Sequence, residues 1–216
     1  MKLSVKEAIE QRRAARSFSL DPIPEDILAK IFRLGVLAPS GFNLQPWRFI
    51  VVREEENKQK LRACAFDQRQ ITEAPVVLIC CGDRRVNNPD YIENVIQLGQ
   101  EAGAMNDKYA NSMRSAIPQL FQHHPCFESR EAWTNRHTML AVAQIMIVAQ
   151  SLGVDSCPME GFVTAQVKEA FNIPPEVDVC CLLPLGYAKE PLKQYGGRFQ
   201  NEKIFFNETF QEDIVL

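Results

Sequence analysis

The stretch that decides the fold reads APSGFNLQPWRF over residues 38–49, where a helix ends, a polar loop follows and a strand begins. Apolar residues before it recur at spacings of three and four, as on one helix face, and Pro39 ends that pattern. The run from Trp47 to Val52 is aromatic and β-branched, which is typical of a buried strand. Between them, Ser40, Asn43 and Gln45 both donate and accept hydrogen bonds. Such side chains suit a planar heterocycle with N–H and C=O edges, or a polar turn that caps itself.

Three arginines stand close together near the N-terminus, at Arg12, Arg13 and Arg16. They close a predicted amphipathic helix, which begins with a capping box formed by Ser4 and Glu7. Guanidinium groups at this density can hold a phosphate, because each forks onto phosphate oxygens, but arginines in a last helical turn also favour the helix dipole. The residues of this helix that we expect to face inward are Val5, Ala8 and Ile9.

Two later segments combine glycine with irregular backbone. Residues 152–162, LGVDSCPMEGF, follow a long apolar helix expected over roughly residues 133–152. Pro158 and Gly161 mark a loop there, and glycine lets a backbone approach a ligand closely. Residues 183–187, LPLGY, end an apolar strand, and Arg198 lies shortly after them. Arg198 is therefore one more candidate phosphate ligand.

Composition bounds the class of protein. The chain has 216 residues, 46% of them hydrophobic, which suffices for one sizeable core, so we expect a single domain over residues 1–216. The net charge of −3 argues against nucleic acid as a partner. The N-terminus does not read as a signal peptide, and the longest apolar run, near residues 139–149, is too short to cross a bilayer. We expect a cytoplasmic protein with no membrane partner.

Cysteines, metals and nucleotide motifs add further exclusions. Cys80–Cys81 and Cys180–Cys181 lie in predicted strands, where neighbouring side chains point to opposite faces, so we interpret the cysteines as reduced core residues. The sequence HHPC at residues 123–126 has no second ligand cluster, and no metal site is predicted. Neither a G-x-G-x-x-G nor a Walker A motif is present. A nucleotide, if bound, must therefore be held by arginines.

Taken in order, these segments resemble the nitroreductase family of FMN-dependent oxidoreductases, from Val5 to about Arg198 and most weakly between Arg84 and Glu131. The resemblance implies an α+β fold with a central mixed β-sheet flanked by helices on both faces. It also implies an intertwined homodimer, with a variable helical insert at about residues 84–131 and a C-terminal arm, about residues 199–216, that crosses onto the partner. The apolar residues expected to anchor that arm are Ile204, Phe205, Phe206, Phe210, Ile214 and Val215.

The same resemblance assigns contacts to FMN. The phosphate, the ribityl chain and one ring edge would be lined by Arg12, Arg13, Ala14, Arg16 and Arg198, with alanine standing where the family usually has serine. The partner subunit would contribute a loop to the phosphate end and the dimethylbenzene side, with Pro39, Ser40, Gly41, Asn43 and Gln45. One flavin face would be covered by Pro158, Met159, Glu160 and Gly161. A backbone N–H of Glu160 or Gly161 would bond flavin N5, so no side chain is expected to be catalytic.

Two further groups of residues follow from the resemblance. Asp67 and Gln70 would lie at the pyrimidine edge, in positions where relatives often carry Asn and, in some cases, Lys. Arg16 would then supply most of the positive charge near N1 and O2 of the reduced ring. The aromatic residues that could shape a substrate slot are Phe42, Phe66, Phe121 and Phe127, although for the last two packing in the core is the favoured role.

The implied activity is hydride transfer from NAD(P)H, through flavin N5, to a nitroaromatic, a quinone or a similar acceptor, by a ping-pong mechanism. A flavin reductase or an enoate-type reductase could use the same scaffold. Two alternatives come from other classes: a flavin-binding module with little turnover, and a dimeric partner-binding protein that has lost the cofactor.

Overall fold

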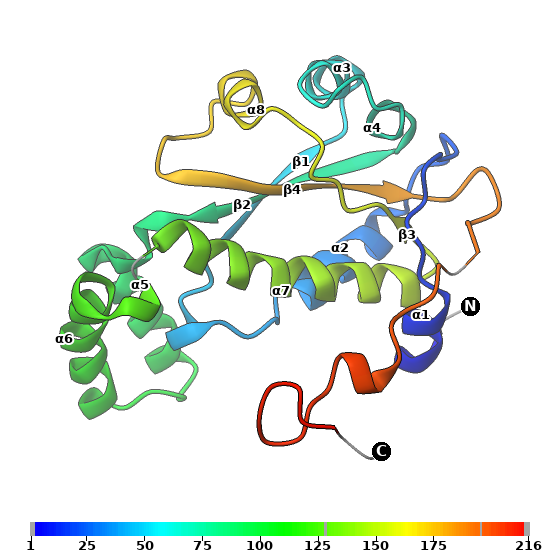
Figure 1. Cartoon of the computed structure of the whole chain (residues 1–216). Coiled ribbons are helices and arrows are strands. Elements are labelled where there is room, and N and C mark those ends of the chain that lie inside the picture. Colours follow the sequence, from blue (N-terminus) through cyan, green and yellow to red (C-terminus); the bar gives the residue numbers. More distant parts are fainter. Residues whose placement is uncertain (1–2, 128, 195, 214–216) are drawn as a thin grey trace.

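A sheet lies between two layers of helices in the computed structural model, which describes residues 3–127, 129–194 and 196–213 (Figure 1). Its strands are β1 (Trp47–Val52), β2 (Val76–Asp83), β3 (Asp155–Ser156) and β4 (Val177–Gly186), in the order β1-β2-β4-β3. All three strand pairings are antiparallel. The α+β class is confirmed, but the expectation of a mixed sheet is wrong for these strands. In the described residues the parallel component is one isolated bridge, between Ala14 and Ser156.

Helices cover both faces of the sheet (Figure 1). On one face lie α3 (Glu55–Ala63), α4 (Gln70–Glu73) and α8 (Thr164–Ala170), and on the other α1 (Val5–Gln11), α2 (Glu25–Gly35) and the long α7 (Arg130–Ser151). At one end, α5 (Pro89–Glu101) and α6 (Asp107–His123) occupy the region expected to be a helical insert. Short 3₁₀ turns are η1 (Gly41–Asn43), η2 (Arg84–Asn87), η3 (Pro125–Phe127) and η4 (Asn201–Lys203).

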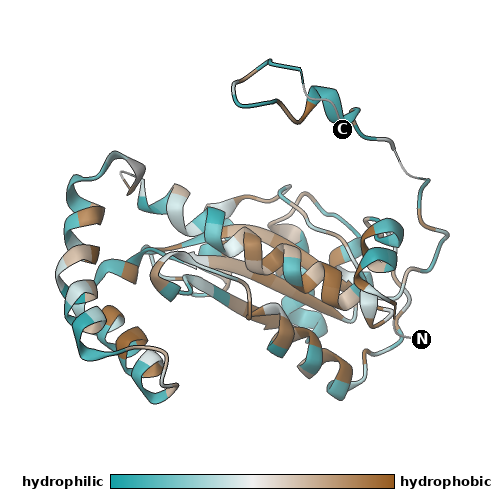
Figure 2. Cartoon of the chain, turned by 90° about the horizontal axis from the view of Figure 1, so that it is seen from below, coloured by the Kyte–Doolittle hydropathy of each residue, from teal (hydrophilic) through white to brown (hydrophobic). Residues whose placement is uncertain are grey.

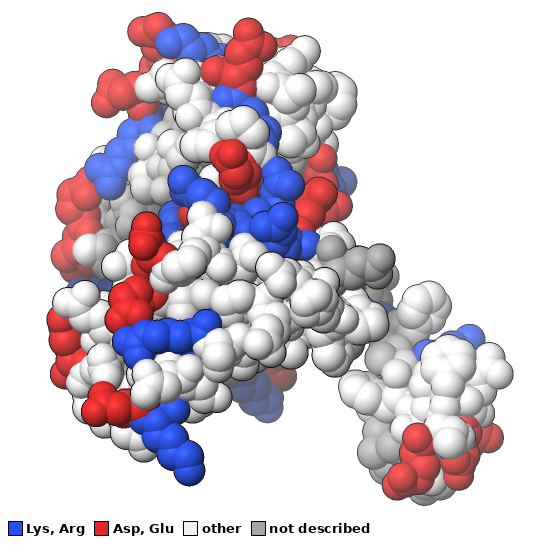
Figure 3. Space-filling model, turned by 90° about the vertical axis from the view of Figure 1, so that its left-hand side faces the viewer, with Lys and Arg blue, Asp and Glu red and all other residues white. Residues whose placement is uncertain are grey.

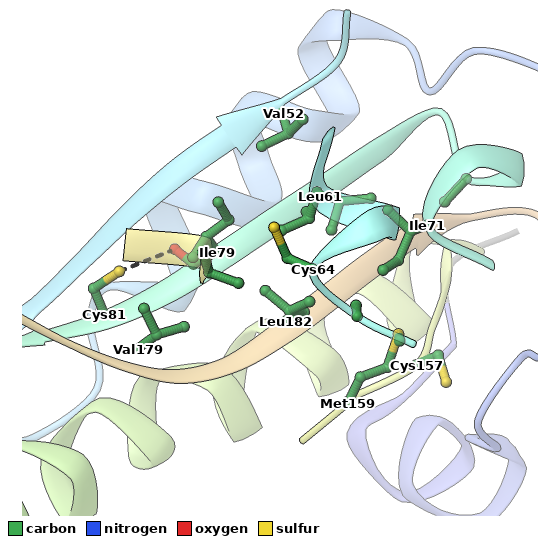
Figure 4. Close-up of a cluster of buried hydrophobic side chains, with 14 of the residues drawn as sticks. Val52, Leu61, Cys64, Ile71, Ile79, Cys81, Cys157, Met159, Val179 and Leu182 are labelled. Carbon is green, nitrogen blue, oxygen red and sulfur yellow. Dashed lines mark hydrogen bonds between the residues drawn. The ribbon is translucent and has the colours of Figure 1, made fainter. Parts of the chain in front are cut away.

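The central strand β2 supplies both main cores. All of its residues are buried. Val77, Ile79 and Cys81 pack with the helices on one face of the sheet, as Figure 4 shows for part of that cluster, while Leu78 and Cys80 pack on the other face. This alternation follows from the pleat, in which successive side chains point to opposite faces. Each fully buried aliphatic side chain contributes roughly 1.5–3 kcal/mol relative to leaving it exposed.

The cysteines behave as core residues. Six of the seven have side chains that the structure describes; these are free thiols, and five of them are buried. Burial raises the pKa of the Cys81 thiol to about 12, and burial likewise raises the pKa of Cys180 to about 12. Both thiols are therefore protonated and unreactive at neutral pH. The prediction of reduced core cysteines is confirmed for these positions.

The sequence predicted several boundaries well and others poorly. The strand β1 spans the predicted Trp47–Val52, and the capping box of Ser4 with Glu7 is present. In α1, however, only Ala8 is buried, whereas Val5 is 67% and Ile9 58% exposed. The reason is that α1 packs against α7 along a single narrow side, so this short helix has less apolar contact than its pattern suggests.

The C-terminal segment stands clear of the body of the molecule (Figures 2 and 3). It carries exposed aromatic rings, with Phe199 76% and Phe210 81% exposed. Ile214 and Val215, which were expected to be part of the arm, lie outside the described residues. Exposed apolar side chains gathered in one segment are typical of a surface that makes contact with a partner.

Among the helices that the structure describes, none combines the length and the apolar character needed to cross a bilayer.

The double-sided burial of β2 gives a stability prediction. Leu78 is fully buried at the centre of the sheet, so Leu78→Ala should lower the free energy of unfolding by about 2–5 kcal/mol through lost burial and the cavity left behind. Leu20→Ala, at a side chain that is 79% exposed, is the matched control and should change it by less than about 0.5 kcal/mol. Denaturant melts of both variants measure the difference, and equal losses would contradict this account of the core.

Candidate functional site

A hollow of about 440 Å³ opens beside the end of α1, where the structure brings together five of the residues predicted to hold a phosphate. Two backbone devices put the arginines there. The helix ends at Gln11, and Arg12 turns into extended backbone with ψ of 126°. Ala14 then bridges to Ser156 at the edge of the sheet, where the Ala15 N–H donates to the Ser156 carbonyl at 3.1 Å. The predicted residues that line the hollow are Arg12, Arg13, Ala14, Arg16 and Arg198.

The two interpretations of the arginines each find support in this placement. Arg12 is the C-cap of α1, and Arg13 bonds a carbonyl of its last turn, as expected for basic residues at a helix end. Within the described part of the chain, Arg12 and Arg16 form no ion pair with a carboxylate, while Arg13 donates to the backbone carbonyls of Glu10 and Arg12 at 2.8 Å each. Two cations at a hollow, Arg12 and Arg16, that have no carboxylate partner among the described residues favour an anionic ligand.

A further cation, Lys193, lines the same hollow and was missed by the sequence reasoning. Gly196 and Gly197 stand immediately before Arg198 and supply no charge. Lys193 lies a few residues earlier in the chain and lines the hollow from there. Its proximity to Arg198 in the sequence was the signal that could have found it.

An unpartnered hydroxyl supports the view that this region holds a ligand. Ser17 lines a smaller hollow that also has Ala14, Arg16 and Lys193 in its wall, and its side chain is almost fully buried. Its Oγ has no hydrogen-bond partner among the residues described. A buried hydroxyl without a partner is uncommon, and it indicates a place for a ligand's polar group. Phosphate oxygens or ribityl hydroxyls have the chemistry to satisfy it.

The segment predicted to cover a flavin face contributes two unpartnered N–H groups. Met159 pairs with Leu182 of β4 through two hydrogen bonds of 2.9 Å, and the Val163 N–H donates to the Cys64 carbonyl at 2.8 Å. Between these anchors, the N–H groups of Glu160 and Gly161 donate to no acceptor in the described residues. Two adjacent amide donors held between fixed points are suited to bind a ring nitrogen or a carbonyl oxygen.

This segment adjoins the cationic hollow. Cys157, immediately before Pro158, is buried with Met159 in the cluster that also contains Ala15. Burial raises the pKa of the Cys157 thiol, and the positive charges of Arg16 and Arg12 oppose that rise because they are close enough to act on it. The segment that carries the arginines and the segment that begins at Cys157 therefore lie near each other.

The segment from Phe66 to Gln70 lies against the same loop. A Cβ added at Gly161 would lie 2.9 Å from Gln68 Nε2 and 3.7 Å from the ring of Phe66, which is 68% exposed. The Asp67 carboxylate pairs with Arg62 at 2.7 Å and has no other partner among the described residues. Gln70 is buried, with its Nε2 donating to Gln68 at 3.1 Å. Gln68, which lies in this segment but was given no role of its own in the prediction, thus connects these two predicted groups.

The polar loop at residues 39–45 does not line the cationic hollow. Gly41 sits against α7, where an added Cβ would lie 3.0 Å from the Trp133 ring and 3.5 Å from His137. The loop also bonds to itself, since Ser40 Oγ accepts from the Gln45 N–H at 2.9 Å and Gln45 Nε2 donates to the Asn43 carbonyl. Both interpretations of this loop, as a ligand contact and as a self-capped turn, therefore remain compatible with its geometry. Pro39 precedes it as an exposed residue.

Left-handed backbone is concentrated in the two predicted ligand loops. Of the eight non-glycine residues with positive φ in the described ranges, five lie there: Phe42, Asn43, Gln45, Phe66 and Asp67. Such conformations cost about 1–3 kcal/mol each in a non-glycine residue and are found preferentially at ligand sites.

The predicted substrate-slot aromatics do not meet in one place within the chain. Phe42, Phe121 and Phe127 pack in the cluster that joins α5 and α6 to Trp133, with ring centroids of Phe121 and Phe127 5.0 Å apart. Phe121 is only 8% exposed, which agrees with the favoured role in packing. Phe66 lies apart from them, beside Gly161.

The hollow and the loop of residues 39–45 lie against different parts of α7. Ile147 lines the hollow, whereas Trp133 and His137 contact Gly41. Along the helix axis, the rise from His137 to Ile147 is about 15 Å at 1.5 Å per residue.

No group of three or more potential metal ligands was found in the described residues, which include His123 and His124.

Comparisons with known proteins bear on this site. The model of the family described as "Nitroreductase family" matches residues 9–187. A Thermus thermophilus protein named NADH dehydrogenase is 32% identical over 188 residues, covering 87% of this chain and 88% of that protein. A Bacillus subtilis protein, named as a candidate NAD(P)H nitroreductase, is 31% identical over 194 residues, covering 85% of this chain and 88% of that one.

A solved structure gives the same result for the fold. It is that of a candidate nitroreductase in complex with FMN from Exiguobacterium sibiricum, with a TM-score of 0.86, 27% sequence identity, and coverage of 95% of this chain and 98% of that one. A family match over most of the chain, with relatives above 30% identity along most of both lengths, establishes the relationship. This chain therefore belongs to the nitroreductase family.

Proposed function

We propose that this protein is an FMN-dependent oxidoreductase that transfers hydride from NAD(P)H to a nitroaromatic, a quinone or a similar acceptor by a ping-pong mechanism. The observation that carries the proposal is the pair of unpartnered amides at Glu160 and Gly161, next to a hollow lined by five cations. The names of relatives, and the FMN in one solved neighbour, support the same cofactor and electron donor. When bound, FMN supplies a ring whose N5 accepts a hydride and releases it to a second substrate.

The chain's own residues would bind and orient that cofactor. Arg12, Arg13, Arg16, Lys193 and Arg198 surround the volume where a phosphate fits, and each can donate to its oxygens. The Ser17 hydroxyl would gain the hydrogen-bond partner that it lacks among the described residues. The amides of Glu160 and Gly161 would donate to the ring, because no other described acceptor uses them.

Arg16 would also serve the ring electronically. It lines both hollows and has no carboxylate partner within the described chain, so its charge is not neutralised locally. Asp67, at the neighbouring edge, is neutralised by Arg62 at 2.7 Å. The charge of Arg16 would favour the reduced, anionic form of a bound flavin. No side chain needs to act as a nucleophile or a proton donor in this scheme.

We further propose that the working unit is a homodimer whose loop at residues 39–45 serves the partner's cofactor. The loop and the arginines are both expected at the phosphate end, yet within one chain they lie about 15 Å apart along α7, counted at 1.5 Å per residue. A second copy resolves this separation. The exposed aromatic residues of the C-terminal arm, with Phe199 76% and Phe210 81% exposed, would be covered by the same partner.

The purified protein should show the visible absorbance of oxidised flavin and lose it on anaerobic addition of NADH or NADPH. Subsequent addition of a quinone or a nitroaromatic should restore the absorbance, because the two half-reactions are separate. A flavin that is bound but reduced only slowly by both donors would favour the alternative of a binding module with little turnover. A protein that stays colourless after incubation with FMN would refute the proposed cofactor.

Removing one arginine of the hollow should weaken FMN binding. A hydrogen bond between charged groups contributes about 1.5–3 kcal/mol, so Arg12→Met should raise the Kd by roughly 10–150-fold. Titration of the apoprotein with FMN, followed by flavin fluorescence, measures this. Arg33→Met is the matched control, since Arg33 lies in the last turn of α2 and outside the hollow, and it removes the same charge. A similar weakening by both variants would attribute the effect to net charge alone.

Mixed dimers should reveal which chain supplies the loop. One variant carries Arg12→Glu and Arg16→Glu, and the other carries Ser40→Leu and Gln45→Leu. Each should bind FMN poorly by itself. In a mixed dimer with exchanged loops, one of the two sites combines the intact arginines of one chain with the intact loop of the other, so about half of the sites should recover. If the loop serves its own chain, co-expression restores no FMN binding, while circular dichroism confirms that both variants are folded.

A further inference from the structure

The side-chain amide of Gln68 lies between two segments of the site that are far apart in the sequence. Its Nε2 donates to the Gly161 carbonyl at 2.8 Å and to the Ala65 carbonyl at 3.1 Å. Both acceptors are carbonyl oxygens, which cannot donate, so only one orientation of this amide satisfies them. The nitrogen must face the loop, and the oxygen must face away.

A second glutamine holds that orientation in place. Gln68 Oε1 accepts from Gln70 Nε2 at 3.1 Å, and Gln70 is 94% buried, with an exposed fraction of only 6%. Each amide in this relay therefore has a defined direction, from Gln70 through Gln68 to the backbone at Gly161. Linked amides in a partly buried setting strengthen one another's hydrogen bonds and resist rotation.

The loop itself is held by few other contacts. Met159 is fixed to β4 and Val163 to the Cys64 carbonyl, and between them the Phe162 N–H makes only a local bond to the Glu160 carbonyl. Among the described residues, Gln68 is the one side chain that hydrogen-bonds to the stretch from Glu160 to Gly161. The absence of a side chain at Gly161 permits this, because a Cβ there would lie 2.9 Å from Gln68 Nε2.

We propose that Gln68 is a positioning residue, which holds the Gly161 carbonyl and so anchors the loop that presents the free N–H groups of Glu160 and Gly161 to the bound ring. The Gly161 carbonyl forms one planar peptide unit with the Phe162 N–H, and it is separated from the Gly161 N–H only by the φ and ψ rotations of Gly161. Holding this carbonyl therefore restricts the rotations of a glycine that has no side chain to restrict them itself. The role toward the ring rests on the proposed function; the restraint on the loop does not.

The restraint on the loop can be tested in the apoprotein by hydrogen exchange of the Met159, Phe162 and Val163 amides. Gln68→Leu removes both donated bonds, and the three amides should exchange about tenfold faster, as expected when roughly 1–1.5 kcal/mol of hydrogen bonding is lost locally. Gln70→Leu removes only the second link and should give a smaller increase. Gln59→Leu, on the exposed side of α3, is the control and should change nothing. Unchanged exchange in Gln68→Leu would overturn the proposal.

The pH dependence of amide exchange shows whether the loop loosens because Gln68 no longer donates hydrogen bonds or because its side chain no longer packs there. In Gln68→Glu the carboxylate would face two carbonyl oxygens and could donate to neither, whereas its protonated form can donate to one of them. Exchange relative to the wild type at the same pH should therefore be fast near neutrality and should slow as the pH falls through the carboxyl pKa. Gln68→Leu should show no such dependence. A pH-independent ratio in Gln68→Glu would overturn the role of donation.

The flavin midpoint potential tests the role toward the ring. An amide donor bonds N5 when N5 is an acceptor, in the oxidised ring, so misdirected amides should weaken binding of oxidised FMN more than reduced FMN, and the potential of Gln68→Leu should rise. An unchanged potential, with faster loop exchange, would overturn the positioning role. Failure of the wild-type protein to bind FMN would refute the proposed function instead. This measurement uses the wild-type protein alone, so the two kinds of failure can be told apart.

Discussion

The burial of β2 on both faces is the constraint on which the rest of the structure depends. Its alternate side chains enter two separate cores, so each helical layer must cover its own face of the sheet. A shift of one residue in register would exchange the two sets, which fixes β1 and β4 against it. The irregularity between Cys80 and Cys81 is accommodated inside this pairing. Because β4 is fixed in this way, it holds β3 and the residues around Met159, which pair with it, in defined positions.

The site is assembled on that edge by backbone pairing. Ser156 belongs to β3, and it forms a parallel bridge with Ala14 in the extended segment that carries the arginines. Met159 pairs with Leu182, and this pairing ends immediately before the two unpartnered amides. Groups held by a sheet edge keep their spacing better than groups on a free loop. The cations and the amide donors thus share one frame, although they come from opposite ends of the chain.

Local patterns made part of this predictable. The strand Trp47–Val52 and the capping box of Ser4 with Glu7 depend only on neighbouring residues, and both were found as predicted. The end of α1 was placed too late, because the bridge from Ala14 to Ser156 draws the chain out of the helix, and a contact between distant segments leaves no trace in local periodicity. The contact of Gln68 with Gly161 also joins distant segments and was missed for the same reason. The grouping of the arginines with Arg198 came from resemblance to a family and not from spacing.

The bridge between Ala14 and Ser156 also bears on how the protein is made. Residues 12–16 leave the ribosome long before the strand that pairs with them, and before Lys193 and Arg198, which complete the hollow. Domains acquire their long-range contacts only when the distant segments are available, and closing such a large loop is slow. The hollow is therefore complete only in a chain that extends to Arg198, and an unfinished chain that ends before β4 has the arginines of residues 12–16 without the rest of the lining.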